Sequence, residues 1–188
     1  MITENHPIYF VKNIFKDKTA LLSFSKYSYV SDSLLDCREV FSLPSSSLSV
    51  DWLELQLQAL DVGQELAINS EVYIGGRKKH LPLIDFSISH WDASFVLRRM
   101  QQIIPKKIIN NLAIYDSGRS FHGYSQVLLT PKDWFNYMGR LLLVNPPGGK
   151  EIIDSRWVGH RVIGGYCALR WSSNTDQYIK EPKRIKFP

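Results

Sequence analysis

The sequence predicts an α+β protein built on a mainly antiparallel sheet. Short runs rich in β-branched and aromatic residues recur along the chain, and two clear amphipathic helix patterns lie between them. Turn signals rather than long linkers separate these runs, so we expect residues 1–188 to form one compact domain. A chain of 188 residues is long enough to bury about two-thirds of its unfolded surface.

The N-terminal part, residues 1–79, is expected to form a smaller α/β lobe. A Gly75-Gly76 pair, followed by basic residues, predicts the tip of a tight hairpin. The elements expected in this part are a strand over residues 8–11, a short helix or strand over 18–24, a helix over 50–60 and a strand over 66–74.

The C-terminal part, residues 80–188, holds the two clear helix patterns. Asp92 is a suitable N-cap for an amphipathic helix over residues 92–104, which the following proline stops. The Thr-Pro-Lys-Asp segment at residues 130–133 has the cap, the first-turn proline and the acid that begin a helix over 131–143. The strands expected to form the sheet behind these helices run over residues 81–89, 108–115, 124–129 and 165–171.

Composition and charge narrow the class of protein. With 44% hydrophobic and 12% aromatic residues, the chain is globular rather than disordered. Without an apolar run of about 20 residues, a secretory signal or a metal-binding cysteine spacing, it reads as a reduced, cytoplasmic protein that makes no membrane contact. The net charge of +5 is clustered, as in many proteins that bind nucleic acid. The clusters lie at residues 77–80, 98–99 and 106–107, and in the tail at Lys180, Lys183, Arg184 and Lys186.

Residues 112–130 carry the densest group of candidate functional side chains. Two apolar runs flank a polar segment in which Gly118 can adopt a positive φ, and this arrangement predicts a hairpin. The turn presents Arg119, Ser120 and His122 within four residues, where a ligand can meet them. The alternative is an ordinary hairpin with one solvated arginine and one hydrogen-bonded histidine.

A second candidate is Asp85, in the middle of the apolar strand over residues 81–89. Alternation places Asp85, Ser87 and Ser89 on one face of this strand. An ionised carboxylate is costly to bury without a partner. The residues leave three explanations open: a hydrogen-bonded structural aspartate, a solvent-facing sheet, or a metal ligand.

The third candidate is Asp154, which follows an apolar pair. Arg156 and Arg161 come soon after it, and the next strand presents Arg170 beside Trp171. This region is too polar for a simple connector and too rich in tryptophan and arginine for an ordinary solvated face.

These motifs, in this order, resemble those of the archaeo-eukaryotic primase superfamily. In that superfamily two acidic residues separated by one are followed by Ser-x-His and then by a single aspartate after a hydrophobic residue. The matching positions here are residues 85–87 (Asp-Phe-Ser), residues 120–122 (Ser-Phe-His) and Asp154. The blocks at 115–124 and 153–175 are especially similar to small bacterial primase 1D-like proteins. The resemblance covers about residues 80–175, and the first 79 residues match no family that we can name.

The resemblance implies an RNA-recognition-like catalytic half and template-directed nucleotidyl transfer with Mg²⁺ or Mn²⁺. The implied substrates are a nucleoside triphosphate and a single-stranded or primer–template nucleic acid, and a helicase or another replication protein is the implied partner. Asp85 and Asp154 would hold the metal and, with His122, form the catalytic group. The triphosphate would be bound by Ser120, His122, Arg119 and Arg170. Nucleic acid would be bound by Arg156, Arg161 and Trp171, with Trp157 and Trp171 as rings that can stack on a base.

One position departs from the family pattern, because Ser87 stands where the second acid of the first motif is usual. Asp92 or Asp116 can in principle replace it, although their places in the chain do not require this. Three hypotheses follow: an active nucleotidyltransferase, a degenerate relative that only binds nucleotide or nucleic acid, and an α+β interaction domain whose aspartates are structural. The first requires Asp85 and Asp154 to converge on one open face; the third requires them to lie far apart.

Overall fold

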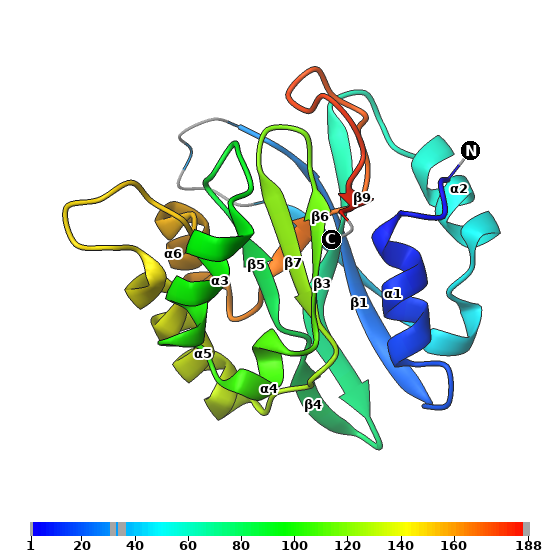
Figure 1. Cartoon of the computed structure of the whole chain (residues 1–188). Coiled ribbons are helices and arrows are strands. Elements are labelled where there is room, and N and C mark those ends of the chain that lie inside the picture. The colour runs from blue at the N-terminus through cyan, green and yellow to red at the C-terminus, as the bar shows by residue number, and fades with distance from the viewer. Residues whose placement is uncertain (1, 31–32, 34–36, 186–188) are drawn as a thin grey trace.

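The fold is α+β, as the sequence predicts. A computed structural model describes residues 2–30, 33 and 37–185, and in this part of the chain six α-helices pack around two antiparallel sheets (Figure 1). Lys186, the last member of the predicted basic tail, lies outside the described residues.

The first sheet has the strand order β2-β1-β3-β4, and β8 also pairs with β3. β4 pairs with residues 71–74 of β3, and β8 pairs with residues 67–69 of the same strand. The two short strands thus pair with successive stretches of β3. Because β8 comes from the C-terminal part, the two parts of the chain share this sheet. Its strands are β1 (Ala20–Ser28), β2 (Arg38–Pro44), β3 (Gln64–Ile74), β4 (Arg77–His80) and β8 (Ala168–Arg170).

The second sheet has the order β5-β7-β6-β9 and carries the central hairpin. Gly118 has φ +108°, and its N–H donates to Asp116 Oδ1 (2.8 Å), so the predicted turn forms between β6 and β7. Asp85, at the end of β5, is the register partner of His122 on β7. The strands are β5 (Leu83–Asp85), β6 (Leu112–Asp116), β7 (Phe121–Ser125) and β9 (Lys183–Arg184).

The helices lie on the two flanks of the sheets, with α1 and α2 on one side and α3 to α6 on the other (Figure 1). The predicted caps form: Asp92 accepts from Phe95 N (3.1 Å) and Thr130 accepts from Asp133 N (3.2 Å). The elements are α1 (Pro7–Ile14), the 3₁₀ turn η1 (Ser45–Ser47), α2 (Val50–Gln58), α3 (Ala93–Gln101), α4 (Lys106–Ile109), α5 (Pro131–Val144) and α6 (Ser155–Gly164).

One hydrophobic core runs through both sheets and the helices that flank them. Trp134 and Trp171 are its largest fully buried side chains, and Phe24 and Phe86 bring β1 and the β5 region into the same cluster. No helix among the described residues is long and apolar enough to cross a membrane.

Several predicted elements are wrong in type or extent. Residues 8–11 belong to helix α1, because His6 Nδ1 accepts from Ile8 N (3.1 Å) and Pro7 occupies the first turn. Residues 106–109 form α4 before the predicted strand begins at Leu112, and the strand predicted over 124–129 is β7, which ends at Ser125. The strand at 165–171 is shorter and joins the first sheet instead of the second.

Candidate functional site

A polar hollow lies where the two sheets meet α6 and the C-terminal segment. It encloses about 270 Å³ and is lined by residues from both ends of the chain. Of the side chains that the sequence singles out, nine line it: Asp85, Arg119, Ser120, His122, Asp154, Arg156, Trp157, Arg161 and Arg170. We call this site the polar hollow below.

Asp85 and Asp154 are held next to each other by the backbone. The Asp154 N–H donates to the carbonyl of Asp85 (3.0 Å), and the neighbouring Phe86 and Ile153 form an isolated β-bridge. Residues 153–154, just before α6, thus lie beside residues 85–86 at the end of β5. The third hypothesis required these aspartates to lie far apart, and they do not.

The environment of Asp85 disfavours a negative charge. Burial, followed by the nearby carboxylate of Asp154, raises the pKa of Asp85 from 3.8 to about 8, although Arg170 and Arg161 oppose this rise. The side chain is still 24% exposed, so water and ions can reach it. Positive charge near Asp85 would favour its ionised form.

Asp154 is the N-cap of α6. Its Oδ1 accepts from the Trp157 N–H (2.8 Å), which satisfies one of the first amides of the helix. Oδ2 takes no part in this bond and is available to a ligand. The motif order predicts Asp154 at this site, but no local signal in the sequence predicts the helix that it caps.

His122 lies beside Asp85 across the β5–β7 ladder. Its Nε2 is 3.8 Å from Asp85 Oδ1, an ion-pair distance too long for a hydrogen bond. Burial and the charge of Arg170 hold the pKa of His122 well below 6.5, so the imidazole is neutral at pH 7. Its Nδ1 is buried without a hydrogen-bond partner, which costs stability unless a ligand or water satisfies it.

Arg170 is committed to the protein backbone. Its Nη2 donates to Ser117 O (2.7 Å) and its Nη1 to Lys180 O (3.1 Å) and to Ser172 O. It therefore ties the β6–β7 turn to the C-terminal segment, and it can reach a nucleotide only by giving up such bonds. Among the described residues that line the hollow, the exposed arginines are Arg119 and Arg156.

Trp171 lies outside the hollow, and the prediction that it contacts nucleic acid is wrong. The side chain is 0% exposed, and its ring packs edge-on against His6 and Phe24. A ring enclosed in the core has no face left for a base. Trp157 is half-buried and does line the hollow, with its Nε1 donating to Ala168 O (3.0 Å).

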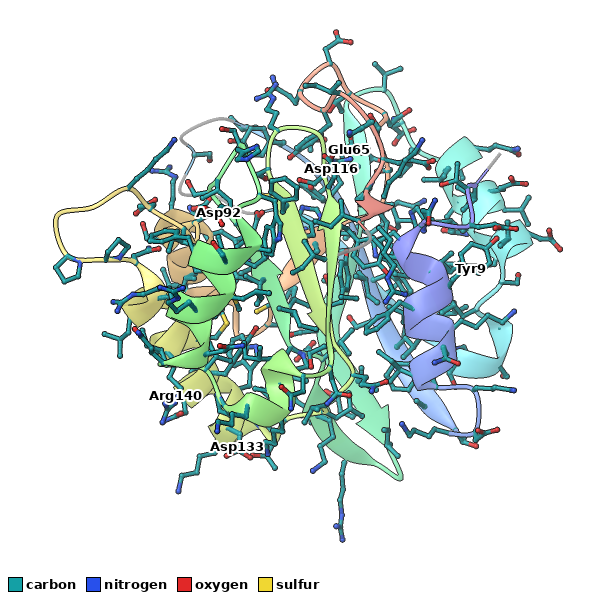
Figure 2. The ribbon with its side chains drawn as sticks, in the orientation of Figure 1. Tyr9, Glu65, Asp92, Asp116, Asp133 and Arg140 are labelled. Atoms are coloured by element: carbon teal, nitrogen blue, oxygen red, sulfur yellow. The ribbon has the colours of Figure 1, made fainter. Side chains whose placement is uncertain are left out.

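Among the described residues, no aspartate or glutamate other than Asp85 and Asp154 lines the hollow. Ser87 is exposed and is not among the residues that line it. Asp116 is paired with Lys180 (2.7 Å), and Asp92 caps α3 on the outside of the molecule (Figure 2). Within the described ranges, no group of three or more His, Cys, Asp or Glu side chains is placed to hold a metal ion. The donor set of Asp85 and Asp154 fits one divalent cation better than two.

Arginine is frequent among the described residues that line the hollow. These residues include five arginines and two aspartates, with His122 and His160 beside them. Arg161 and Arg170 oppose the rise in the pKa of Asp85, and Arg156 Nη2 donates to Ser33 O (3.4 Å). Guanidinium groups match phosphate oxygens in geometry and in charge.

The C-terminal segment, residues 172–185, closes one wall of the hollow. Glu65, 0% exposed, accepts from Asn174 N (2.9 Å), Thr175 N (2.9 Å), Thr175 Oγ1 (2.8 Å) and the Ser172 hydroxyl. Figure 2 shows Glu65 and Asp116 toward the same end of the two sheets, and Asp116 holds the segment through Lys180. These bonds fix Tyr178 at the edge of the hollow.

Sequence reasoning missed a second group of lining residues: Tyr27, Tyr29, Arg38, His160 and Tyr178. Tyr27 is the second-last residue of β1 and Tyr29 follows its last residue, whereas Tyr178 comes about 150 residues later. Only the pairing of β1 and β8 with the same strand brings these segments together. The Tyr-Ser-Tyr spacing was the one available signal, because it places both rings on one face of a strand.

The comparisons with known proteins agree with the motifs. An α+β fold whose hollow combines Asp85, the Ser-x-His pair and Asp154 has the motif order of archaeo-eukaryotic primases. The chain belongs to the archaeo-eukaryotic primase 1D-like family, whose model matches residues 44–183. The match begins well before residue 80, so α2 and the β3–β4 hairpin are part of the family's domain. Comparison with curated proteins and with solved structures finds no match.

Proposed function

We propose that the protein is a primase-polymerase-type nucleotidyltransferase that uses one nucleoside triphosphate at a time in the polar hollow. The observation that supports this most is the convergence of Asp85, Asp154 and His122 with Ser120 on one accessible site. Family membership supports this reaction class, and the arginines among the described lining residues favour a polyphosphate ligand.

In this proposal Asp85 and Asp154 hold a divalent cation. Such a cation, Mg²⁺ or Mn²⁺, would supply positive charge to the triphosphate and to the attacking hydroxyl. Burial and Asp154 raise the pKa of Asp85 to about 8, so this carboxyl is largely protonated at neutral pH and would have to give up its proton to hold a cation. The carboxylates orient the ligand; the protein provides no nucleophile of its own.

The phosphates would be bound by the β6–β7 turn. Ser120 Oγ and the neutral imidazole of His122 can donate hydrogen bonds, and the exposed Arg119 adds charge. The buried, unpartnered Nδ1 of His122 and the 3.8 Å gap at Nε2 both leave capacity for a ligand. Arg156 at the start of α6 is placed for a second phosphate, either of the nucleotide or of the template strand.

The test is product formation by two matched aspartate variants. Both Asp154 and Asp92 are helix N-caps, and asparagine caps a helix about as well as aspartate. Asp154→Asn therefore removes a charge from the hollow without removing the cap, and Asp92→Asn makes the same change outside it. With Mn²⁺, labelled triphosphates and a primed or unprimed template, we expect wild type and Asp92→Asn to form product and Asp154→Asn to form none. Equal product from all three would refute the role given to Asp154.

A second candidate function, binding of nucleotide or nucleic acid without catalysis, is favoured by Ser87, which stands where the second acid of the first motif is usual. Ser87 cannot supply the charge that a second cation needs, and Asp92 and Asp116 are placed elsewhere. This candidate predicts no product with any divalent cation, together with salt-sensitive binding of single-stranded DNA that survives Asp154→Asn. The product-formation assay therefore separates the two functions, because only the nucleotidyltransferase forms product.

A further inference from the structure

We propose that Tyr29 is the stacking platform for the nucleobase of the bound nucleotide and that Tyr178 holds this ring in place. This inference rests on the proposed function, since it concerns the other end of the same ligand. The substrate class that it names is any nucleoside triphosphate, purine or pyrimidine, because every base offers a π-face to an aromatic ring.

Tyr29 presents an open ring to the hollow. It follows the last residue of β1, lines the hollow and is 48% exposed. An aromatic side chain that is half exposed at the mouth of a pocket loses apolar contact with water when a flat ligand covers it. Tyr27, two residues earlier, is buried and forms the floor behind it.

Tyr178 supports Tyr29 from the C-terminal segment. The two rings meet edge to face, with centroids 6.1 Å apart and an interplanar angle of 61°. The Arg170 guanidinium lies 3.9 Å from the centroid of the Tyr178 ring. Tyr178 is thus engaged with Arg170 and Tyr29, and Tyr29 keeps the larger open surface.

The support is rigid, which an effective stacking platform needs. The Tyr178 N–H donates to Thr175 O (3.2 Å), the Ser173 hydroxyl donates to Tyr178 O (3.0 Å), and Thr175 is fixed by Glu65. The side chains of Tyr27 and Tyr178 also hydrogen-bond to each other. Little conformational freedom remains to be lost at this wall when a ligand binds.

The aromatic wall and the carboxylates belong to one site. Tyr29 and Tyr178 line the same hollow as Asp85 and Asp154, and so do Arg119 and Ser120 of the β6–β7 turn. The volume of about 270 Å³ is just below the range of about 300–1,000 Å³ for small-molecule pockets, so the ligand that it suits is small. In this inference a single nucleotide places its phosphates at the β6–β7 turn and its base against the tyrosines.

The experiment compares two ligands that share phosphates but differ in the base. Binding of ATP and of inorganic tripolyphosphate is measured by calorimetry, with Mg²⁺ present, for the wild-type chain, Tyr29→Ala, Tyr29→Phe and Tyr9→Ala. Tyr9 is a matched control: it is 40% exposed, but it lies on α1 and outside the hollow (Figure 2). A thermal unfolding curve for each variant confirms that it is folded.

We expect Tyr29→Ala to weaken ATP binding by about 5- to 100-fold, the range for loss of base–aromatic stacking, and to leave tripolyphosphate binding within about twofold. Tyr29→Phe keeps the ring and should bind both ligands as wild type does, as should Tyr9→Ala. If wild type binds both ligands and Tyr29→Ala weakens neither, or weakens both equally, the inference is overturned while the proposed function stands. If wild type binds neither ligand, the proposed function fails and the inference with it.

Discussion

Replacing Asp85 with asparagine should make the metal-free protein more stable, and increasingly so as the pH rises. Asparagine has the shape of the protonated aspartate but cannot ionise. The pKa of Asp85 is raised from 3.8 to about 8 in the folded chain by burial and by Asp154. Between these values the native state keeps a proton that the unfolded chain has lost, so the free energy of unfolding of the wild type falls as pH rises.

The magnitude follows from the shift. Each pH unit within this window costs at most about 1.4 kcal/mol, so the cost between pH 5 and pH 8 is at most ~4 kcal/mol. Because the side chain is 24% exposed, solvent reduces the penalty, and we expect about half of that amount, ~2 kcal/mol.

The assay is urea unfolding of both proteins at pH 5 and pH 8 with a chelator present. The stability advantage of Asp85→Asn over wild type should grow by ~2 kcal/mol between the two pH values. Asp92→Asn is the control. A hydrogen bond from Ser94 lowers the pKa of Asp92, so this carboxylate stays ionised in the folded protein throughout the range. The difference in free energy of unfolding between Asp92→Asn and wild type should therefore be the same at pH 5 and pH 8. An advantage that stays constant, or that shrinks as pH rises, would refute the environment described for Asp85.

Three further predictions concern the parts that support the hollow. Glu65→Ala should lower the free energy of unfolding by at least ~3 kcal/mol, because it leaves several donors of the C-terminal segment unpaired. The rate of hydrogen exchange over residues 172–178 should rise in the same variant. Glu39→Ala, at an exposed position on β2, should change neither the stability nor the exchange rate. Trp171→Phe should lower the melting temperature and leave the affinity of the folded protein for single-stranded DNA unchanged, since its ring is in the core; a selective loss of DNA binding would restore the role that we withdrew. Gly123→Ala should cost about 1–3 kcal/mol, because its Cβ would lie 3.1 Å from Ile84 Cβ and 3.2 Å from Phe86 Cε2, whereas Gly139→Ala on α5 meets open space and should stabilise by up to ~1 kcal/mol; equal effects in urea unfolding would contradict the close β5–β7 packing.

Local signals predicted the elements whose ends are set by nearby residues. Asp92 and the Thr-Pro-Lys-Asp segment cap α3 and α5 as expected, and the glycines of the β3–β4 and β6–β7 turns have the positive φ values that those turns require. The order of the three motifs was enough to indicate the family, which the family match confirms.

The failures have a common cause in long-range contacts. Residues 8–11 have high β propensity, yet α1 forms because His6 caps it and also donates from Nε2 to Trp171 O (2.9 Å), a contact 165 residues away. The helix α6 contains two glycines, so its propensity is low, and it depends on Asp154 as its cap. The burial of Trp171 could not be predicted from alternation, since both faces of β8 are covered.

The same limit applies to the hollow. The sequence indicated which carboxylates and which histidine to examine, but the tyrosine wall arises from β1 and the C-terminal segment, which the chain separates by about 150 residues. That Tyr27, Tyr29 and Tyr178 line one side of the hollow can be predicted only when the pairing of β1 and β8 with β3 is known.

In the proposed function, Asp85 and Asp154 together hold a divalent cation. The most direct measurement is a Mn²⁺ titration followed by electron paramagnetic resonance, which reports free Mn²⁺ and needs no catalysis. We predict that wild type and Asp92→Asn bind Mn²⁺ alike. Asp85→Asn and Asp154→Asn should each lose more than about 100-fold in affinity, the upper end of the range for a residue that only supports a ligand. Binding of equal strength in all four proteins, or no binding by wild type, would contradict it.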